Sequence, residues 1–137
     1  MVIIVCVDER RGMTFNGRRQ SRDGKIYADI AENMAEGSRL LADEYSKPLF
    51  SELAINAEFR GDFLDVAEKG DVCFVEKGAL LPYVKKAEKL IIYHWNRHYP
   101  SDTRLDIIPE NIGFSLVATK EFEGNSHEKI TKEIYGK

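Results

Sequence analysis

The chain has 137 residues, of which 43% are hydrophobic, and this is enough apolar material for one core. We therefore expect a single domain over residues 1–137, and the apolar content excludes a disordered chain. The 23 acidic and 20 basic residues leave a net charge of −3. A dedicated nucleic-acid binder usually carries a basic surplus, so this balance argues against nucleic acid as a partner.

The first apolar segment, residues 2–7, is followed at once by the charged residues 8–11 (DERR). A signal peptide places its positive charge first, and a membrane-spanning helix needs roughly 20 apolar residues. We therefore expect a cytoplasmic protein with no membrane partner. Cys6 and Cys73 each lie within an apolar run, which predicts buried, reduced thiols rather than a disulfide framework.

The first third of the chain predicts a strand, a loop and a helix. Residues 2–7 are continuously apolar and β-branched, which is typical of a strand buried on both faces. Residues 9–22 are rich in turn residues and arginine, and we predict a long loop there. Asp23 is a suitable N-cap, and apolar residues at i, i+4 and i+8 predict a helix over residues 24–36 that Gly37 ends.

The remaining chain alternates short predicted strands and helices before a different tail. Strands are expected at 39–43, 72–75 and 89–95, and helices at 46–53, 62–68 and 79–87. Strands separated by helices favour parallel pairing in a sheet covered on both faces. Residues 114–122 and 128–135 both alternate and leave no room for a crossover helix. An antiparallel hairpin is therefore expected to close the sheet.

Both ends of the chain carry strings that also occur together in one enzyme family. Residues 2–17 have an opening strand and a glycine-containing loop, and residues 75–95 run through a predicted helix into an apolar strand. Asp102-Thr103, and Asn125-Ser126-His127 within the alternating tail, complete the pattern. It resembles dihydrofolate reductase. The resemblance implies an α/β fold: a three-layer, dihydrofolate reductase-like mixed sheet, mainly parallel, with a C-terminal antiparallel hairpin.

The residues differ from the family where the resemblance implies acid chemistry. The family's buried carboxylate holds the pterin, and the gap-free equivalent here is Ile26, which cannot relay a proton. A three-residue slip brings Asp29 to the same helix face, and Asp29 is then the candidate catalytic residue. Tyr93 stands where the family has a threonine that orients the carboxylate, and it is a candidate ligand-binding residue.

The cofactor side differs as well. The resemblance implies a glycine pair that approaches a dinucleotide, and this pair falls near Glu76. Gly78 and Ala79, retained nearby, are the candidate cofactor-binding residues. Residues 43–44 are both acidic where phosphates would bind, and like charges repel. No cofactor is therefore predicted, with NADPH as the alternative, and no metal site is predicted because the histidines lack a ligand cluster.

An arginine-rich segment, residues 9–25, is the strongest functional candidate. It carries six basic and two acidic residues within a chain of net charge −3. Arginine offers planar donors to a phosphate or carboxylate, and neutral side chains can add hydrogen bonds. The candidate ligand-binding residues in this segment are Asn16, Arg18, Arg19, Ser21 and Arg22. The alternative is a flexible, solvated loop.

Three functions follow from these patterns, and whether the protein is an enzyme is left open. The leading prediction is a diverged dihydrofolate reductase-like pseudoenzyme that binds a small anionic or nucleotide-like ligand, such as a phosphate-bearing compound, under the arginine-rich segment. The second is an NADPH-dependent reductase of a pterin-like substrate with Asp29 as the acid. The third is an interaction or RNA-binding module. No nucleophile elbow or phosphate-binding loop motif is present, so nucleophilic catalysis is not predicted.

Overall fold

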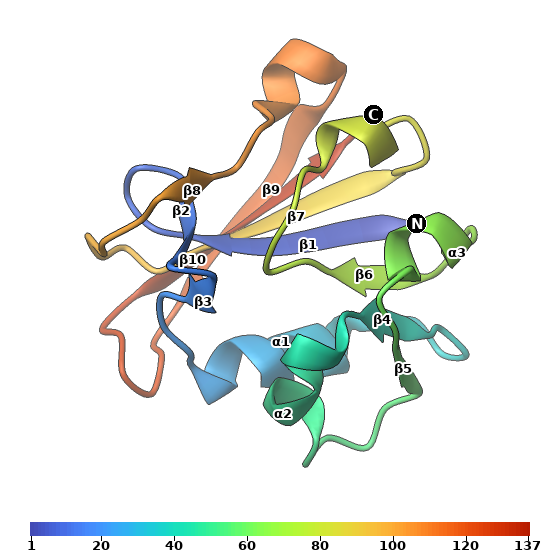
Figure 1. Cartoon of the computed structure of the whole chain (residues 1–137), viewed down its shortest axis with the longest axis horizontal. Coiled ribbons are helices and arrows are strands. Elements are labelled where there is room, and N and C mark those ends of the chain that lie inside the picture. The colour runs from blue at the N-terminus through green and yellow to red at the C-terminus, as the bar shows by residue number, and fades with distance from the viewer.

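The computed structural model describes all 137 residues, and a seven-stranded sheet forms its centre (Figure 1). The strands are β1 (Val2–Val7), β4 (Leu40–Ala42), β5 (Ala57–Phe59), β6 (Val72–Phe74), β7 (Lys89–His94), β9 (Ser115–Phe122) and β10 (Ile130–Gly136). Their spatial order is β5-β4-β6-β1-β7-β10-β9. The first five of these run parallel, whereas β10 pairs antiparallel with both β7 and β9. The mainly parallel mixed sheet and its closing hairpin are thereby confirmed.

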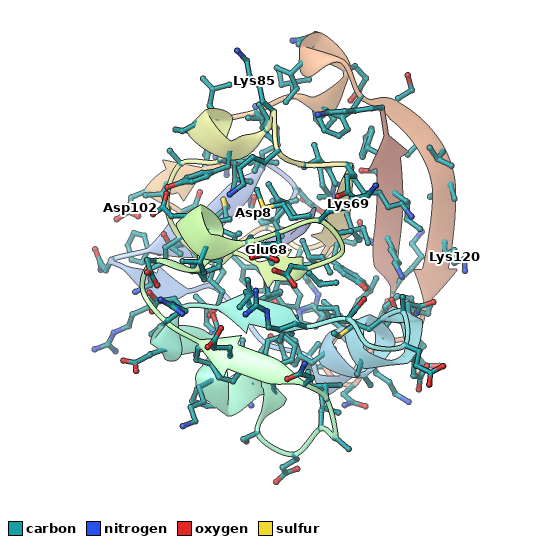
Figure 2. The ribbon with its side chains drawn as sticks, turned by 90° about the vertical axis from the view of Figure 1, so that its right-hand side faces the viewer. Asp8, Glu68, Lys69, Lys85, Asp102 and Lys120 are labelled. Carbon is teal, nitrogen blue, oxygen red and sulfur yellow. The ribbon has the colours of Figure 1, made fainter.

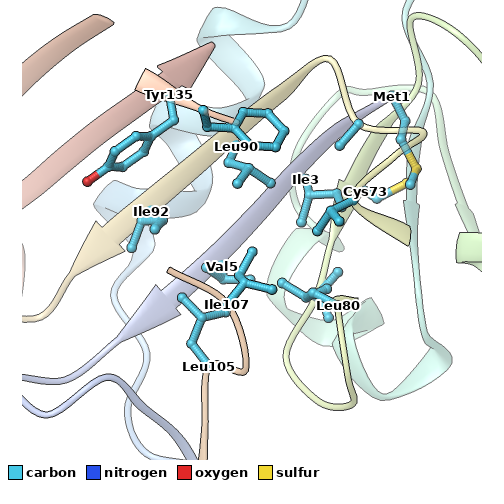
Figure 3. Packing of buried hydrophobic residues seen from close by; sticks show 14 of the residues in the cluster. Met1, Ile3, Val5, Cys73, Leu80, Leu90, Ile92, Leu105, Ile107 and Tyr135 are labelled. Atoms are coloured by element: carbon cyan, nitrogen blue, oxygen red, sulfur yellow. The ribbon is translucent and has the colours of Figure 1, made fainter. Parts of the chain in front are cut away.

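Two hydrophobic clusters cover the two faces of this sheet. Alternate residues of β1 divide between them, since Ile3 and Val5 belong to one cluster and Ile4 to the other. Figure 3 shows Ile3 and Val5 packing beside Leu80 and Ile107, which come from the segments that cover the first face. Because β1 is buried on both sides, its sequence is continuously apolar, as the strand prediction required.

The second face is covered by α1 (Gly24–Asn33) and α2 (Lys47–Phe50), which lie together on one side of the sheet in Figure 1. Asp23 caps α1, because its side chain accepts a hydrogen bond from the Lys25 amide at 3.0 Å. The predicted start of this helix is confirmed, but the predicted end at residue 36 is wrong. Asn33 Nδ2 donates to the Asp29 carbonyl oxygen at 2.8 Å, and this side-chain bond at the last turn competes with continued helix.

The predicted long loop over residues 9–22 is wrong, because it contains a hairpin. Strands β2 (Gly12–Phe15) and β3 (Arg18–Arg19) pair antiparallel and join β8 (Thr103–Arg104) in a separate three-stranded sheet. The turn between them is Asn16-Gly17, with φ angles of 51° and 72°. Asn-Gly is the preferred pair for a two-residue hairpin turn with two positive φ angles. The arginines are therefore held on a defined ribbon.

The predicted helix over residues 79–87 is also wrong, since only a 3₁₀ turn, Leu81–Tyr83, forms there. Successive amides bond three residues back, as Lys86 N does to the Tyr83 carbonyl at 3.0 Å. The Asp106 carboxylate accepts a hydrogen bond from the Leu80 amide at 2.9 Å, which holds the start of this turn in place. The apolar residues in this segment therefore lie on consecutive tight turns and not on an α-helix.

The other short helices are smaller than their sequence patterns suggested. Residues 46–53 form part of a 3₁₀ turn, Glu44–Ser46, followed by α2, and α3 covers only Phe63–Val66. A further 3₁₀ turn spans Pro109–Ile112 before β9. Strand β9 is an edge of the main sheet, and Figure 2 places Lys120 on this outer strand, on the opposite side of the molecule from Asp102. No helix of the chain has the length and apolar character that crossing a bilayer requires.

Candidate functional site

An inner pocket lies where β1, β6 and β7 end, and an outer pocket adjoins it along the β2–β3 hairpin. The inner pocket is walled by the aromatic residues Tyr27, Phe74 and Trp95 and also contains Arg19 and Glu76. Its cavity volume is about 20 Å³, which is room for about one water. The outer pocket has a cavity volume of about 480 Å³. Ligands of open α/β sheets bind at the carboxyl ends of the strands, so this is the expected position for a site.

Arg19 reaches across the inner pocket to Glu76 in a two-point ion pair. Its Nε lies 2.7 Å from Oε1 and its Nη2 lies 2.9 Å from Oε2. Ser46 Oγ donates to the same carboxylate at 2.6 Å. The guanidinium also stacks on Tyr45, with its central carbon 4.2 Å from the ring centroid. The hydrogen bond to Glu76 raises the pKa of Arg19, and the pair leaves the inner pocket without net charge.

The outer pocket is lined by Arg18 in addition to Arg19, and no acidic residue lines it. Arg18 is exposed here and makes no ion pair. Asn16 stands beside it, and only its main-chain amide is occupied, donating to Asp102 Oδ2 at 3.0 Å. Phe15 and Tyr99 add aromatic surface. The outer pocket therefore carries an available positive charge.

Gln20 lies between the two pockets and contributes to both linings. Its Nε2 donates to Asp8 Oδ2 at 2.9 Å and to the Pro100 carbonyl oxygen at 3.3 Å. Its Oε1 is buried and has no hydrogen-bond partner. A buried acceptor without a donor costs free energy, so a ligand with an N–H or O–H group at this position would be stabilised. Gln20 was not among the site residues predicted from the sequence.

Ser21 lines the inner pocket at the end of a hydrogen-bonded chain. Its Oγ lies 3.3 Å from His127 Nε2, and His127 Nδ1 lies 2.9 Å from Asp23 Oδ2. Burial alone would raise the pKa of Asp23, but amides of the hairpin turn and His127 outweigh it and lower the pKa to about 2. The hydroxyl of Tyr99 lies 2.8 Å from the same Nε2. Four residues from three segments thus share one network.

The structure brings Asp29 and Tyr93 into contact. The Tyr93 hydroxyl donates to Asp29 Oδ2 at 2.6 Å, and burial together with this carboxylate raises the pKa of Tyr93. Lys132 Nζ also lies 2.8 Å from Asp29 Oδ2, and its side chain is only 3% exposed. Neither Asp29 nor Tyr93 lines the inner or the outer pocket. The Asp29 carboxylate on α1 is therefore already paired with Lys132 from β10.

Three further candidate residues lie apart from both pockets. Arg22 lines a separate depression between α1 and α2. Gly78 and Ala79 are exposed in the turn after β6. The nearby Asp43 carboxylate caps the Glu44–Ser46 turn through the Tyr45 amide at 2.9 Å. Asp43 and Glu44 form no ion pair and make this turn acidic, which does not fit the phosphates of a dinucleotide.

Glu76, which pairs with Arg19 in the inner pocket, was not predicted as a site residue. In the sequence it was noted only because it stands where the family has its glycine pair. One available signal was its position, because a charged residue directly after a buried strand faces the carboxyl edge of the sheet. The partnership of Asp23 with His127 had a weaker signal. The two residues are 104 positions apart, and only the resemblance of the tail to a closing hairpin hinted that they would meet.

Comparison with known proteins shows which solved structures have a similar fold. No protein-family model matches the chain, and no curated protein sequence matches it. Among solved structures, the chain is similar to a dihydrofolate reductase from Enterococcus faecalis in complex with NADP(H) and RAB-propyl, with a TM-score of 0.68. The two are 12% identical over 98% of this chain and 94% of that chain. The protein therefore has a dihydrofolate reductase-like α/β fold, with a mainly parallel seven-stranded sheet and a separate three-stranded antiparallel sheet.

Proposed function

We propose that the protein is a diverged member of this fold that lacks the usual reductase site and binds a small anionic, nucleotide-like ligand in the outer pocket. One observation carries the proposal: two neighbouring arginines have opposite fates. Arg19 is neutralised by Glu76, whereas Arg18 lines the outer pocket without a carboxylate partner. A planar guanidinium without an ion pair suits a phosphate or carboxylate group.

The surroundings of Arg18 support a ligand that combines an anionic group with a flat ring. Phe15 is 43% exposed, and Tyr99 lies in the same lining, so both offer stacking surface. The Asn16 side chain offers an amide group, with both a donor and an acceptor. A volume of about 480 Å³ lies within the range of small-molecule sites. These features favour a nucleotide-like compound over a bare inorganic ion.

The same geometry argues against the usual reductase site. The carboxylate of Asp29 is occupied by Lys132 and Tyr93 and lies outside the pockets. The carboxylates of Asp43 and Glu44, which form no ion pair, would repel cofactor phosphates. The E. faecalis neighbour was solved with NADP(H). These two features support a pseudoenzyme with respect to pterin reduction.

Binding is tested by calorimetric titration with AMP, inorganic phosphate and NADPH at two salt concentrations, followed by thermal unfolding with each compound. We expect AMP to bind and to stabilise the fold, because a ligand at 100 times its Kd adds about 2.7 kcal/mol. Arg18→Ala should weaken AMP binding about tenfold or more. Arg104→Ala is the matched control, since Arg104 is also exposed and unpaired but lines neither pocket.

Other outcomes would overturn the proposal. Stabilisation by NADPH together with NADPH oxidation on a pterin-like substrate, abolished by Asp29→Asn, would establish the reductase alternative. Binding of a short RNA that weakens steeply with salt, with no response to AMP, would establish the interaction module. An Arg18→Ala variant that binds AMP as well as the parent does would remove the outer pocket from the function.

A further inference from the structure

A serine, a histidine and an aspartate form a continuous hydrogen-bonded chain that ends at the inner pocket. Ser21 Oγ lies 3.3 Å from His127 Nε2, and His127 Nδ1 lies 2.9 Å from Asp23 Oδ2. His127 is 3% exposed and Asp23 is 2% exposed, whereas Ser21 is only partly buried and lines the pocket. The base and the acid are thus shielded from water, and the hydroxyl faces the space where a small substrate would enter.

The surrounding contacts fix the orientation of the imidazole ring. His127 stacks on Trp95, with ring centroids 4.8 Å apart and planes inclined by 27°. The Asp23 carboxylate also accepts the main-chain amides of Asn125 at 2.9 Å and Ser126 at 3.0 Å, so it is anchored at both oxygens. These amide bonds favour the ionised carboxylate. An ionised Asp23 accepts a hydrogen bond from Nδ1–H, which leaves the lone pair of Nε2 directed at hydroxyl groups.

We propose that Ser21 is a nucleophile for the hydrolysis of small esters, with His127 as general base and Asp23 as positioning residue. Ser21 Oγ attacks the ester carbonyl carbon while its proton passes to His127 Nε2. The bond to the leaving alcohol breaks, and the alcohol takes that proton. Water then gives a proton to His127 and attacks the acyl-serine, releasing the carboxylic acid and returning the proton to Ser21. The roles follow the general logic of an activated hydroxyl, and no redox partner is needed.

Only a short acyl group could reach Ser21, and Arg19 would have to shift to admit it. Aromatic side chains and Arg19 wall the inner pocket, and its cavity volume of about 20 Å³ is room for about one water. Two nitrogens of Arg19, Nε and Nη2, are committed to Glu76 and to the Tyr45 carbonyl oxygen, whereas Nη1 makes no hydrogen bond. A cationic donor in the same lining favours the negative oxygen that develops on the attacked carbonyl. Cys6 is not an alternative nucleophile, because burial and Glu76 raise its pKa.

Tyr99 competes with Ser21 for the same lone pair. Its hydroxyl lies 2.8 Å from His127 Nε2, closer than Ser21 Oγ at 3.3 Å. Removal of this hydroxyl should leave Ser21 as the only hydroxyl within hydrogen-bond distance of His127 Nε2. Tyr99→Phe is therefore expected to increase the reactivity of Ser21. An ordinary surface serine that reacts by chance would not respond to this change, so the variant distinguishes the relay from incidental acylation.

The full chain is incubated with p-nitrophenyl acetate, and p-nitrophenolate release is followed together with the acetylated peptide by mass spectrometry. We expect acetylation at Ser21, a loss of about 100-fold in rate for Ser21→Ala and a several-fold gain for Tyr99→Phe. Ser51→Ala is the matched control, because Ser51 is exposed, does not line the inner pocket and bonds only the Pro48 carbonyl oxygen. Asp23→Asn should lower kcat and leave KM unchanged, which a merely structural role would not produce.

Acetylation confined to lysine side chains or the N-terminus, or a rate that Ser21→Ala does not change, would overturn the proposal. A Tyr99→Phe rate equal to or below that of the parent would also overturn it. Ser21 is partly exposed, so its replacement by alanine leaves the fold intact and a lost rate reports on chemistry. The ester assay is independent of AMP binding at Arg18, and each proposal can fail without the other.

Discussion

Arg19 and Glu76, which are 57 residues apart, meet in a two-point ion pair across the inner pocket, with contacts of 2.7 Å and 2.9 Å. The side chains are 21% and 9% exposed. An arginine that sequence reasoning treats as an anion receptor is thereby turned into the internal partner of a carboxylate. The neighbouring Arg18 keeps its charge for the outer pocket. Because Glu76 pairs with Arg19, Arg18 is the arginine of this hairpin whose charge is not neutralised by a carboxylate.

Glu76→Gln should destabilise the protein and expose a second anion receptor. The substitution removes charge-assisted hydrogen bonds to Arg19 and Ser46, and we expect a loss of about 2 kcal/mol in the free energy of unfolding. Urea unfolding measures this loss, and phosphate titration should show tighter binding because Arg19 is released. Glu58→Gln is the control: its ion pair with Arg39 is 44% exposed on the Glu58 side, so the loss should stay below about 1 kcal/mol. Equal losses for the two variants would contradict this account.

Asp29→Asn should reduce stability without affecting AMP binding. It leaves Lys132, 3% exposed, without its counter-charge, and a broken buried ion pair costs about 3 kcal/mol or more. Replacing both residues, as Asp29→Asn with Lys132→Met, should recover most of that loss because no unpaired charge remains. Chemical denaturation of the two single variants and the double variant tests this coupling. Loss of AMP affinity in folded Asp29→Asn would instead connect this residue to the binding site.

Acid should destabilise the protein partly through Asp23. Its pKa is lowered to about 2 in the folded chain, from an ordinary value of 3.8. A lowered pKa stabilises the fold above the unfolded value, and the contribution is lost as the pH falls from about 4 to 2. Asp23→Asn should be less stable at neutral pH but should show a shallower decline over this range. Unfolding free energies at pH 2 to 6 measure both slopes, and parallel slopes would remove Asp23 from the acid response.

Gly12→Ala should destabilise the hairpin and disturb the outer pocket. A Cβ at this position would lie 2.6 Å from Asp8 Oδ2 and 2.6 Å from Ser101 Cβ, so both must move. Overpacking of this kind costs about 1–3 kcal/mol. Asp8 Oδ2 also accepts the hydrogen bond from Gln20, so weaker AMP binding is expected as well. Gly61→Ala provides the control, because a Cβ there meets nothing within 4 Å and thermal unfolding should be nearly unchanged.

The elements that were predicted correctly have strong local patterns. Strand β1 is continuously apolar because it is buried on both faces, and the start of α1 is set by a capping aspartate. The closing hairpin could be predicted because apolar and polar residues alternate in the sequences of β9 and β10, and a short turn joins the two strands. The hairpin at Asn16-Gly17 was missed although its turn pair was visible, because its strands are short and polar.

The candidate site was only partly accessible from the sequence. Asn16, Arg18, Arg19 and Ser21 do gather around the two pockets, because the β2–β3 hairpin carries the first three and leads directly into the fourth. Arg22, two residues before α1 begins, lines a different depression. Successive side chains of a strand point to opposite faces, so the position of a residue along the hairpin decides which pocket its side chain faces. The charge composition of the segment does not contain that information.

By itself, the sequence determined the class of fold, the central strand, the parallel order with its antiparallel closure and the concentration of positive charge near the N-terminus. These features follow from periodicity and composition, which act over a few neighbouring residues. Only the tertiary structure decided which arginine is neutralised, that Asp29 pairs with Lys132, and that Ser21, His127 and Asp23 form one hydrogen-bonded chain. Each of these depends on contacts between residues far apart in the chain, where distance and burial set the strength of a charge or hydrogen bond.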